Sequence, residues 1–258
     1  LKFDTSLPLR KNMGDYTHLL KPILSFRYSP NGNSDISSKN ILLNYDNIFN
    51  LDRIGSPHQV EGGESLSMGL EFKRLKIDEE SNLEFKVGNV LKLKENHKLP
   101  SKSKLNKKRS DIFGDLDFKL NKNIKTGYSF SYDKDLKYSN LEEINFEYNI
   151  NNFITNFTYY TEKNEIGDKE SIKNVSSFNI DKENKISFET TKDLKEDFTE
   201  YYDFIYTYQT DCISINLNYN RSFYRDGNLE PNKSLSFLIR IIPFTELGVS
   251  NLGSLVGN

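Results

Sequence analysis

The sequence predicts an all-β protein, and more narrowly part of an antiparallel transmembrane β-barrel. Apolar and polar residues alternate in one segment after another, short and long links alternate between these segments, and no run of about eighteen apolar residues interrupts the pattern. Alternation with a period of two gives a strand one apolar and one polar face. Such strands occur in the half-buried sheets of soluble β-proteins and in outer-membrane barrels, whose apolar face contacts lipid.

Composition narrows the function without choosing between these two structures. The chain has 258 residues and a net charge of -2, so its overall charge does not favour binding to nucleic acid. Mean hydropathy is -0.66, and the 13% aromatic content consists of Tyr and Phe without Trp. A barrel exposes only alternate residues to lipid, so low mean hydropathy is compatible with it. The chain begins with Leu1, and we expect a processed chain or a fragment.

We expect about thirteen strands, each taking roughly twenty residues with its turn. In the stretch CISINLNYNRSF, for example, Ile213, Leu217 and Tyr219 share one parity, whereas Asn216 and Asn218 share the other. The predicted strands are Thr5–Leu9, Pro22–Tyr28, Leu66–Phe72, Leu83–Leu93, Ile112–Leu120, Tyr128–Tyr132, Ile144–Ile150, Phe153–Tyr159, Phe178–Ile180, Ile186–Phe188, Tyr202–Tyr208, Cys212–Phe223 and Leu235–Ile241.

The links favour the membrane barrel over the soluble sheet. One set is short: 121–123, 149–152, 181–184 and 210–211. The alternate set is longer: 29–63, 94–110, 161–170, 193–199 and 224–231. Outer-membrane barrels have tight turns on one side and long loops on the other. We therefore predict part of a barrel, either an open sheet or a half barrel, over residues 1–244, followed by a tail at 245–258.

Several residues are candidates for binding. The link at 94–110 carries seven Lys or Arg and one Glu. Its Lys107, Lys108 and Arg109 are candidate phosphate contacts, although a mobile, solvated loop explains the same composition. Arg221 has the parity of the lipid-facing residues, so it either contacts a lipid phosphate or extends to the interface. Cys212 is the only cysteine, so it is either a small buried side chain or a thiol available to a partner. No catalytic, metal-binding or cofactor motif is recognised.

Three segments resemble the outer-membrane lipopolysaccharide-assembly proteins of the LptD/OstA family. They are LKFDTSLPLRKNMGDYTHLLKPILSFRYSPN at the start, LLNYDNIFNLDRIGSPHQVEGGESLSMGLEF at 42–72, and TYQTDCISINLNYNRSFYRDGNLEPNKSLSFLIRI at 207–241. The middle of the chain, 120–199, resembles the family only in its alternating strands. The resemblance implies the C-terminal half of a barrel in the Gram-negative outer membrane, and lipopolysaccharide and membrane lipids as partners.

The resemblance also implies roles for individual residues. The last strand would line a lateral seam through Ser234, Ser236, Leu238 and Arg240. Cys212 would form a disulfide with a region outside this chain. Tyr45, Asp46, Asp52 and Arg53 would belong to a loop that caps the lumen, with Asp52 and Arg53 pairing to other loops. A plug lipoprotein and a periplasmic bridge protein are implied as further partners. The alternatives are another outer-membrane transporter barrel, of porin or autotransporter type, or a secreted β-sandwich binding module.

Overall fold

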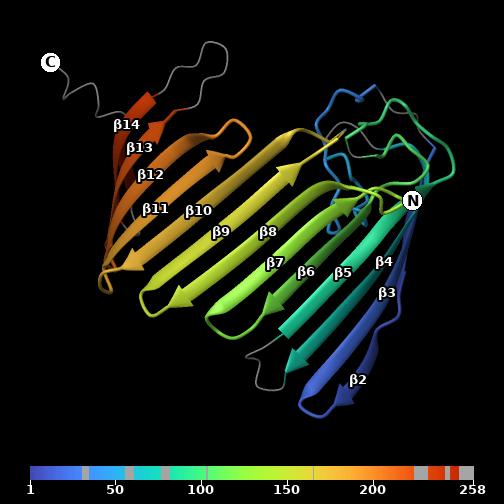
Figure 1. Ribbon diagram of the computed structural model, residues 1–258, viewed down its shortest axis with the longest axis horizontal. Coiled ribbons are helices and arrows are strands. Elements are labelled where there is room, and N and C mark those ends of the chain that lie inside the picture. Colours follow the sequence, from blue (N-terminus) through green and yellow to red (C-terminus); the bar gives the residue numbers. More distant parts are fainter. Residues whose placement is uncertain are drawn as a thin grey trace. The chain divides into compact units, whose positions relative to one another are not determined.

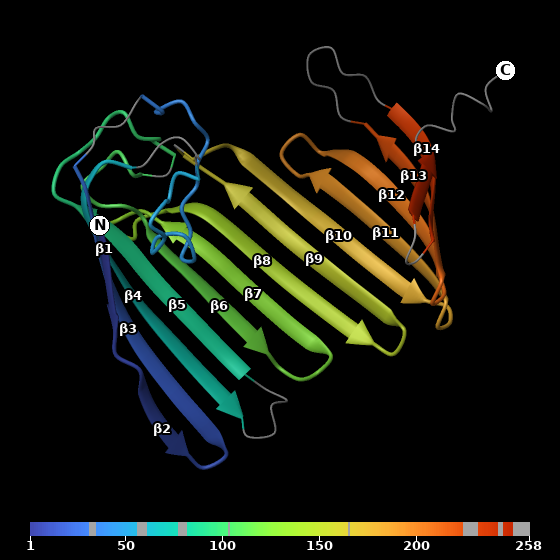
Figure 2. The same ribbon diagram turned by 180° about the vertical axis from the view of Figure 1, so that it is seen from behind.

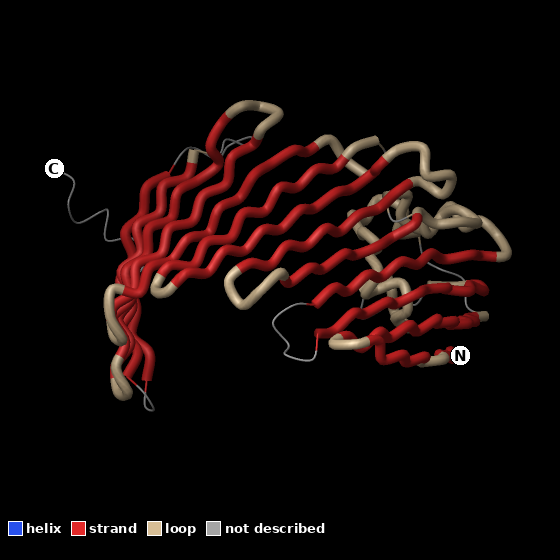
Figure 3. Tube along the Cα trace, turned by 60° about the horizontal axis from the view of Figure 1, so that its bottom comes forward, coloured by secondary structure: helices blue, strands red, loops and turns tan. Residues whose placement is uncertain are grey.

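The computed structural model describes residues 1–30, 35–55, 61–76, 82–102, 104–164, 166–223, 232–241 and 245–249. All regular elements in this part of the chain are β-strands (Figure 3). Over the same residues, no helix has the length and apolar character needed to cross a membrane. The all-β prediction is therefore confirmed.

The strands form an antiparallel meander in which neighbours in sequence are neighbours in the sheet. The order is β1-β3-β4 and onward in sequence to β15, and β2 pairs with β3 beside β1. This order does not return to its first strand within the described residues, so the sheet is an open meander. The strands are β1 (Lys2–Ser6), β2 (Leu9–Met13), β3 (Tyr16–Ser29), β4 (Gly63–Lys76), β5 (Asn82–Lys92), β6 (Ile112–Lys119), β7 (Ile124–Tyr132), β8 (Ser139–Ile150), β9 (Phe153–Glu162), β10 (Lys169–Asn179), β11 (Asn184–Asp193), β12 (Phe198–Gln209), β13 (Ile213–Ser222), β14 (Asn232–Ile241) and β15 (Thr245–Val249).

Two compact units divide the chain. Unit 1 is Leu1–Ile144 with Tyr160–Lys169, and unit 2 is Asn145–Tyr159 with Glu170–Asn258. In unit 1, the long β3–β4 and β5–β6 links gather at one end of the strands, as the two opposite views show (Figure 1 and Figure 2). We call this end the long-link edge.

Two segments differ from the sequence prediction. The expected strand Thr5–Leu9 is broken, because β1 ends at Ser6 and β2 begins at Leu9. Pro8 lies in the break and has no N–H to donate to a β-ladder, which explains the interruption. The expected tail begins with a strand instead, since Thr245–Val249 pairs with Phe237–Ile241 of β14. The rest of that tail and the link 224–231 lie outside the described residues.

In unit 1, the cross-strand register separates an apolar from a polar face. On β4 and β5, Leu70 is paired with Val87 and Phe72 with Phe85. The alternate positions pair Ser67 with Val90, Gly69 with Gly88, and Glu71 with Lys86. Leu24 and Phe26 of β3 lie on the apolar face and are 44% and 42% exposed. The apolar face is therefore not the side on which the polypeptide forms its core.

Unit 2 has the same two faces. Phe188 is paired with Phe204, and Ile186 with Tyr206, between β11 and β12. On the other face of β12 and β13, Thr207 is paired with Asn216. Phe204 is 44% exposed. Exposed aromatic side chains on an otherwise regular strand require an apolar medium, a partner or a second layer to cover them.

The buried core of unit 1 is built from the long links rather than between two sheets. Its residues come from the β3–β4 link, the β5–β6 link and the polar face of β5 and β6. They are Ile36, Leu43, Tyr45, Ile48, Ile54, Val90, Leu99, Leu105 and Phe113. Val90 and Phe113 share the polar face, because Val90 is paired with Ser67 and Phe113 with Gly88. We call this assembly of links on the polar face the loop cluster.

Candidate functional site

A pair of glycines lets the loop cluster approach the sheet closely. Gly69 and Gly88 are cross-strand partners on the polar face. A Cβ at Gly88 would lie 2.8 Å from Ile48 Cδ1 and 2.7 Å from the Met68 carbonyl oxygen. A Cβ at Gly69 would lie 2.5 Å from Phe49 Cζ. Only glycine leaves room for these contacts, so the two residues form a shallow seat for the β3–β4 link.

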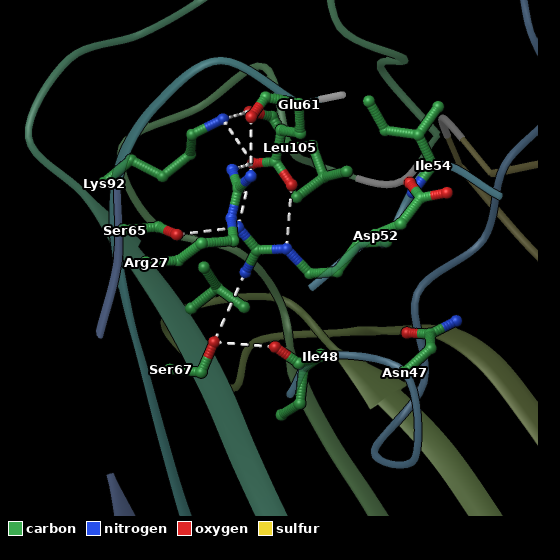
Figure 4. Close-up of polar contacts among 12 residues, drawn as sticks. Arg27, Asn47, Ile48, Asp52, Ile54, Glu61, Ser65, Ser67, Lys92 and Leu105 are labelled. Carbon is green, nitrogen blue, oxygen red and sulfur yellow. Dashed lines mark hydrogen bonds and ion pairs between the residues drawn. The ribbon is translucent and has the colours of Figure 1, made fainter. Parts of the chain in front are cut away.

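A buried network of charges fixes the same link to the strands (Figure 4). Glu61 Oε2 accepts from Arg53 Nε at 2.8 Å, and Glu61 Oε1 accepts from Arg53 Nη2 at 2.9 Å. Lys92 Nζ of β5 and Arg27 Nη2 of β3 each lie 3.0 Å from Glu61 Oε1. The four side chains are between 0% and 4% exposed. We call these residues the Glu61 network.

Neutral groups also bind members of the network. Arg53 Nη2 donates to Ser65 Oγ at 2.7 Å, and Arg27 Nη1 donates to the Glu61 carbonyl oxygen at 2.5 Å. Lys92 Nζ donates to the Leu105 carbonyl oxygen at 2.9 Å, which ties the second long link to the first. One residue of the network therefore contacts both links of the loop cluster.

The electrostatics of the network depend on Glu61. Burial alone would raise the pKa of this carboxyl group, but Arg53, Lys92 and Arg27 together hold its pKa below the ordinary value. Three cations surround a single carboxylate, so the network carries an excess of positive charge in a site with little access to water. Such a site is stable only while every member has its partner.

Tyr45 provides a third attachment. Its ring packs edge-on against Phe49, with centroids 5.3 Å apart, and its hydroxyl donates to Glu71 Oε1 of β4 at 3.3 Å. Burial, followed by the nearby Glu71 carboxylate, raises the pKa of the Tyr45 hydroxyl, so it remains a neutral donor. Asp46, next to it, lies 3.9 Å from Lys86 Nζ and is mostly exposed.

The described residues place the contacts of Asp52 and Arg53 within their own link and on β4, and the expected pairing with other loops stays a prediction. Asp52 Oδ1 accepts from the backbone nitrogens of Ile54 at 3.0 Å and Gly55 at 3.1 Å, so it stabilises its own turn. Arg53 binds Glu61, which the sequence analysis did not identify. The other partners of Glu61, which are Arg27 and Lys92, were missed too, because they are far away in sequence and each is one charge among many on a polar strand face.

The β5–β6 link is a folded segment, which contradicts the expectation of a mobile, solvated loop. Its Leu99 and Leu105 are 0% exposed. The Lys92 nitrogen donates to the Lys108 carbonyl oxygen at 2.7 Å, and the Ser110 nitrogen donates to the Val90 carbonyl oxygen at 2.9 Å. The side chains of the candidate phosphate contacts, Lys107, Lys108 and Arg109, are exposed on this ordered backbone.

The remaining predicted residues lie in unit 2, away from the loop cluster in sequence. Cys212 is exposed, and its nitrogen lies 3.4 Å from Thr210 Oγ1 in the short β12–β13 link. Arg221 is exposed on the apolar parity, with its guanidinium 4.5 Å from the centroid of the Phe223 ring.

The predicted seam strand is not the last strand. Ser234, Ser236, Leu238 and Arg240 share one face of β14, opposite Asn220, Asn218, Asn216 and Ser214 of β13. β14 also pairs with β15, which the sequence analysis did not anticipate. The pairing with β15 includes Leu238 and Arg240, whereas Ser234 and Ser236 precede it.

An antiparallel meander with one exposed apolar face, and with long links folded onto its polar face, has the organisation of a membrane β-barrel transport protein. The sequence model of the family described as "LptD: LPS transport system D" matches residues 1–186. The chain therefore belongs to the LptD family. The search among curated proteins gave no match. The family match includes the loop cluster and β1 to β10, and the resemblance of residues 207–241 lies outside it.

Proposed function

We propose that this chain is part of an outer-membrane β-barrel that assembles lipopolysaccharide into the outer leaflet, and that its apolar face contacts lipid. The observation that carries the proposal is the exposure of apolar side chains on one face, in a member of a lipopolysaccharide transport family. Contact with lipid would remove these apolar side chains from water, which is favourable. The open meander would continue into further strands of a longer chain.

The polar face would then line a hydrated lumen. Its Asn, Ser and Thr side chains supply neutral hydrogen-bonding groups, as in the bond from Thr207 to Asn216. Such a surface suits passage of the saccharide part of a glycolipid, since amides and hydroxyls exchange hydrogen bonds with sugar hydroxyls. The loop cluster, including Tyr45 and Arg53, would cap this lumen at the long-link edge.

Release into the membrane would use a lateral seam near the C-terminal strands. The end of β14 that holds Ser234 and Ser236 precedes its pairing with β15, and weak pairing would lower the barrier to opening. The short links would lie in the periplasm. Cys212 beside one of them would form a disulfide with another region of the full-length protein, and a plug lipoprotein and a periplasmic bridge protein would complete the machine.

The lipid-facing assignment can be tested by placing a cation on either face of β11. Phe188 and Ser187 are adjacent, and Phe188 is 36% exposed on the apolar face. In a bilayer, Phe188→Arg should cost about 2–4 kcal/mol near the midplane, whereas Ser187→Arg should face water. We expect only Phe188→Arg to reduce the folded fraction of the full-length protein, measured by the heat-dependent shift of the folded band on gels. Equal tolerance of both variants would reject lipid contact.

Delivery distinguishes this function from the alternatives. In cells depleted of the natural protein, the full-length protein should restore lipopolysaccharide at the surface. Restored solute uptake without lipopolysaccharide delivery would indicate another transporter barrel. A protein that stays soluble and monomeric without detergent would indicate a secreted β-sandwich module.

A further inference from the structure

A second polar site lies at the long-link edge of unit 1, beside the loop cluster. A cavity of about 450 Å³ opens between the β5–β6 link and the β7–β8 link. Five cationic residues line it: Lys104, Lys107, Lys108, Arg109 and Lys134. We call this cavity the basic pocket. Four of the cations come from one link, and the fifth comes from a link that follows two strands later.

The acidic residues of the basic pocket are largely committed to the protein itself. Asp111 is 4% exposed, and its Oδ2 accepts from Asn140 Nδ2 at 2.7 Å and from Ser131 Oγ at 3.1 Å. Burial raises the pKa of Asp111. Asp133 is also buried, and its carboxylate accepts from backbone nitrogens of its own turn, which lowers its pKa against the effect of burial. Only Glu95 is an exposed acid on the rim.

Lys134 is paired with Asp135 at 3.0 Å, whereas Lys107, Lys108 and Arg109 are held on an ordered backbone with their charges available. The Lys107 nitrogen donates to the Lys104 carbonyl oxygen at 3.2 Å, and Arg109 forms a β-bridge with Leu91. The side chains of Lys107, Lys108 and Arg109 are exposed, and none of the three forms an ion pair with another residue in the described part of the chain. Three consecutive free cations on an ordered backbone are suited to a compact, multiply charged anion.

An aromatic residue completes the basic pocket. Tyr138 lines it and is 48% exposed. A half-exposed phenol has a flat apolar ring and a polar hydroxyl, which can pack against a sugar ring and bond its hydroxyls. The cavity is within the size range of small-ligand sites.

We infer that the basic pocket binds a phosphorylated saccharide, with the phosphate on Lys107, Lys108 and Arg109 and the sugar ring against Tyr138. That this saccharide belongs to a glycolipid cargo rests on the proposed function. The binding itself depends only on the cations, the aromatic ring and the cavity between the two links.

The test is a calorimetric titration of the full-length protein in detergent with glucose 1-phosphate, inorganic phosphate and glucose. We expect glucose 1-phosphate to bind most tightly, and its binding to weaken as salt rises. The triple variant Lys107→Gln, Lys108→Gln, Arg109→Gln should lose at least about tenfold in affinity for both phosphates. The matched variant Lys122→Gln, Lys182→Gln, Lys185→Gln removes three exposed cations, two from short links and Lys185 from the start of β11, and should bind as the wild type does. Tyr138→Ala should reduce the ratio of the affinity for glucose 1-phosphate to the affinity for inorganic phosphate.

Unchanged affinity of the Lys107/Lys108/Arg109 variant for glucose 1-phosphate would overturn the assignment. A second outcome would also overturn the assignment: the wild type binds phosphatidylglycerol vesicles, this variant does not, and neither binds glucose 1-phosphate. The pocket would then be a site for a lipid headgroup. The titration uses soluble ligands and does not depend on transport. A failure of surface delivery therefore contradicts the proposed function, and a failure of the titration contradicts the pocket.

Discussion

Replacing Glu61 with Gln should release the loop cluster from the sheet. The substitution keeps the shape of the side chain but removes the one carboxylate that faces Arg53, Arg27 and Lys92. The new amide nitrogen would direct its N–H groups at these cations, whereas the carboxylate oxygen that it replaces accepts from them. Three cations at most 4% exposed would then be left without a counter-charge.

The magnitude follows from the burial of these pairs. Removing one partner of a buried ion pair typically costs about 3–5 kcal/mol, because the remaining charge is desolvated and unpaired. Here one carboxylate serves three cations, so the upper half of that range is expected for Glu61→Gln. A cost of about 4–5 kcal/mol raises the population of the open link by a factor of about a thousand to several thousand.

Hydrogen exchange of the full-length protein in detergent measures this opening. Amides of the β3–β4 link that are bonded in the closed state, such as Ile36 to the Lys98 carbonyl oxygen at 2.9 Å, should exchange much faster in Glu61→Gln. Strand amides of β4 and β5 should change little. Glu64→Gln removes a charge three residues away and should leave the link protected. The double variant Glu61→Gln, Lys92→Met should recover part of the protection, since it removes one orphaned cation. Equal protection in Glu61→Gln and the wild type would refute the role given to the network.

Three further predictions concern the same regions. The pKa of Glu61 is lower in the folded protein than in the unfolded chain, so the contribution of Glu61 to stability is complete above the unfolded pKa and is lost as pH falls through the folded pKa. Hydrogen exchange measured at each pH should therefore show that the link stays protected at pH 5 and loses protection below about pH 4. In the same experiment, Gly88→Ala should destabilise the closed link by about 1–3 kcal/mol, because the new Cβ would lie 2.7 Å from the Met68 carbonyl oxygen. Adding Ile48→Ala should restore only part of the lost protection, because the contact with the Met68 backbone remains. Wild-type protection in Gly88→Ala would contradict the role of Gly88 as a seat for the β3–β4 link. Reduced protein should react at Cys212 with a membrane-impermeant maleimide added from the short-link side, and labelling only from the long-link side would reverse the proposed orientation.

Local alternation was sufficient to predict most of the sheet. From β4 to β14, each strand overlaps a segment whose apolar residues recur at every second position, and a period of two assigns the faces without tertiary information. The prediction from alternation failed in segments where apolar and polar residues do not alternate clearly. β2 has the sequence LRKNM, which is mostly polar, and it forms because β3 is long enough to pair with both β1 and β2. β15 is short and follows a link with no turn motif that we recognised.

The candidate site was harder to predict, because it is defined by residues far apart in sequence. Tyr45 and Arg53 were identified within one link, but Arg27, Glu61 and Lys92 come from β3, the end of the link and β5. Nothing in the local sequence Glu61-Gly62-Gly63-Glu64 indicates that its first residue is fully buried. The seat formed by Gly69 and Gly88 depends on strand register, which brings together two glycines that look unrelated along the chain.

The location of the core explains why the loop cluster and the sheet should respond separately to mutation. The cluster buries apolar residues such as Ile48, Leu99 and Leu105 against the polar face. Strands outside this patch have no comparable core in the described residues, and aromatic residues such as Phe204 stay exposed on the other face. Their stability must come from backbone pairing and from the medium that covers the apolar face. A change in the Glu61 network removes side-chain contacts between the links and the strands but no backbone pairing between strands, so the links can open while the sheet stays paired. Under the proposed function, a lumen cap that opens in this way would leave the wall of the barrel intact during passage of a large cargo.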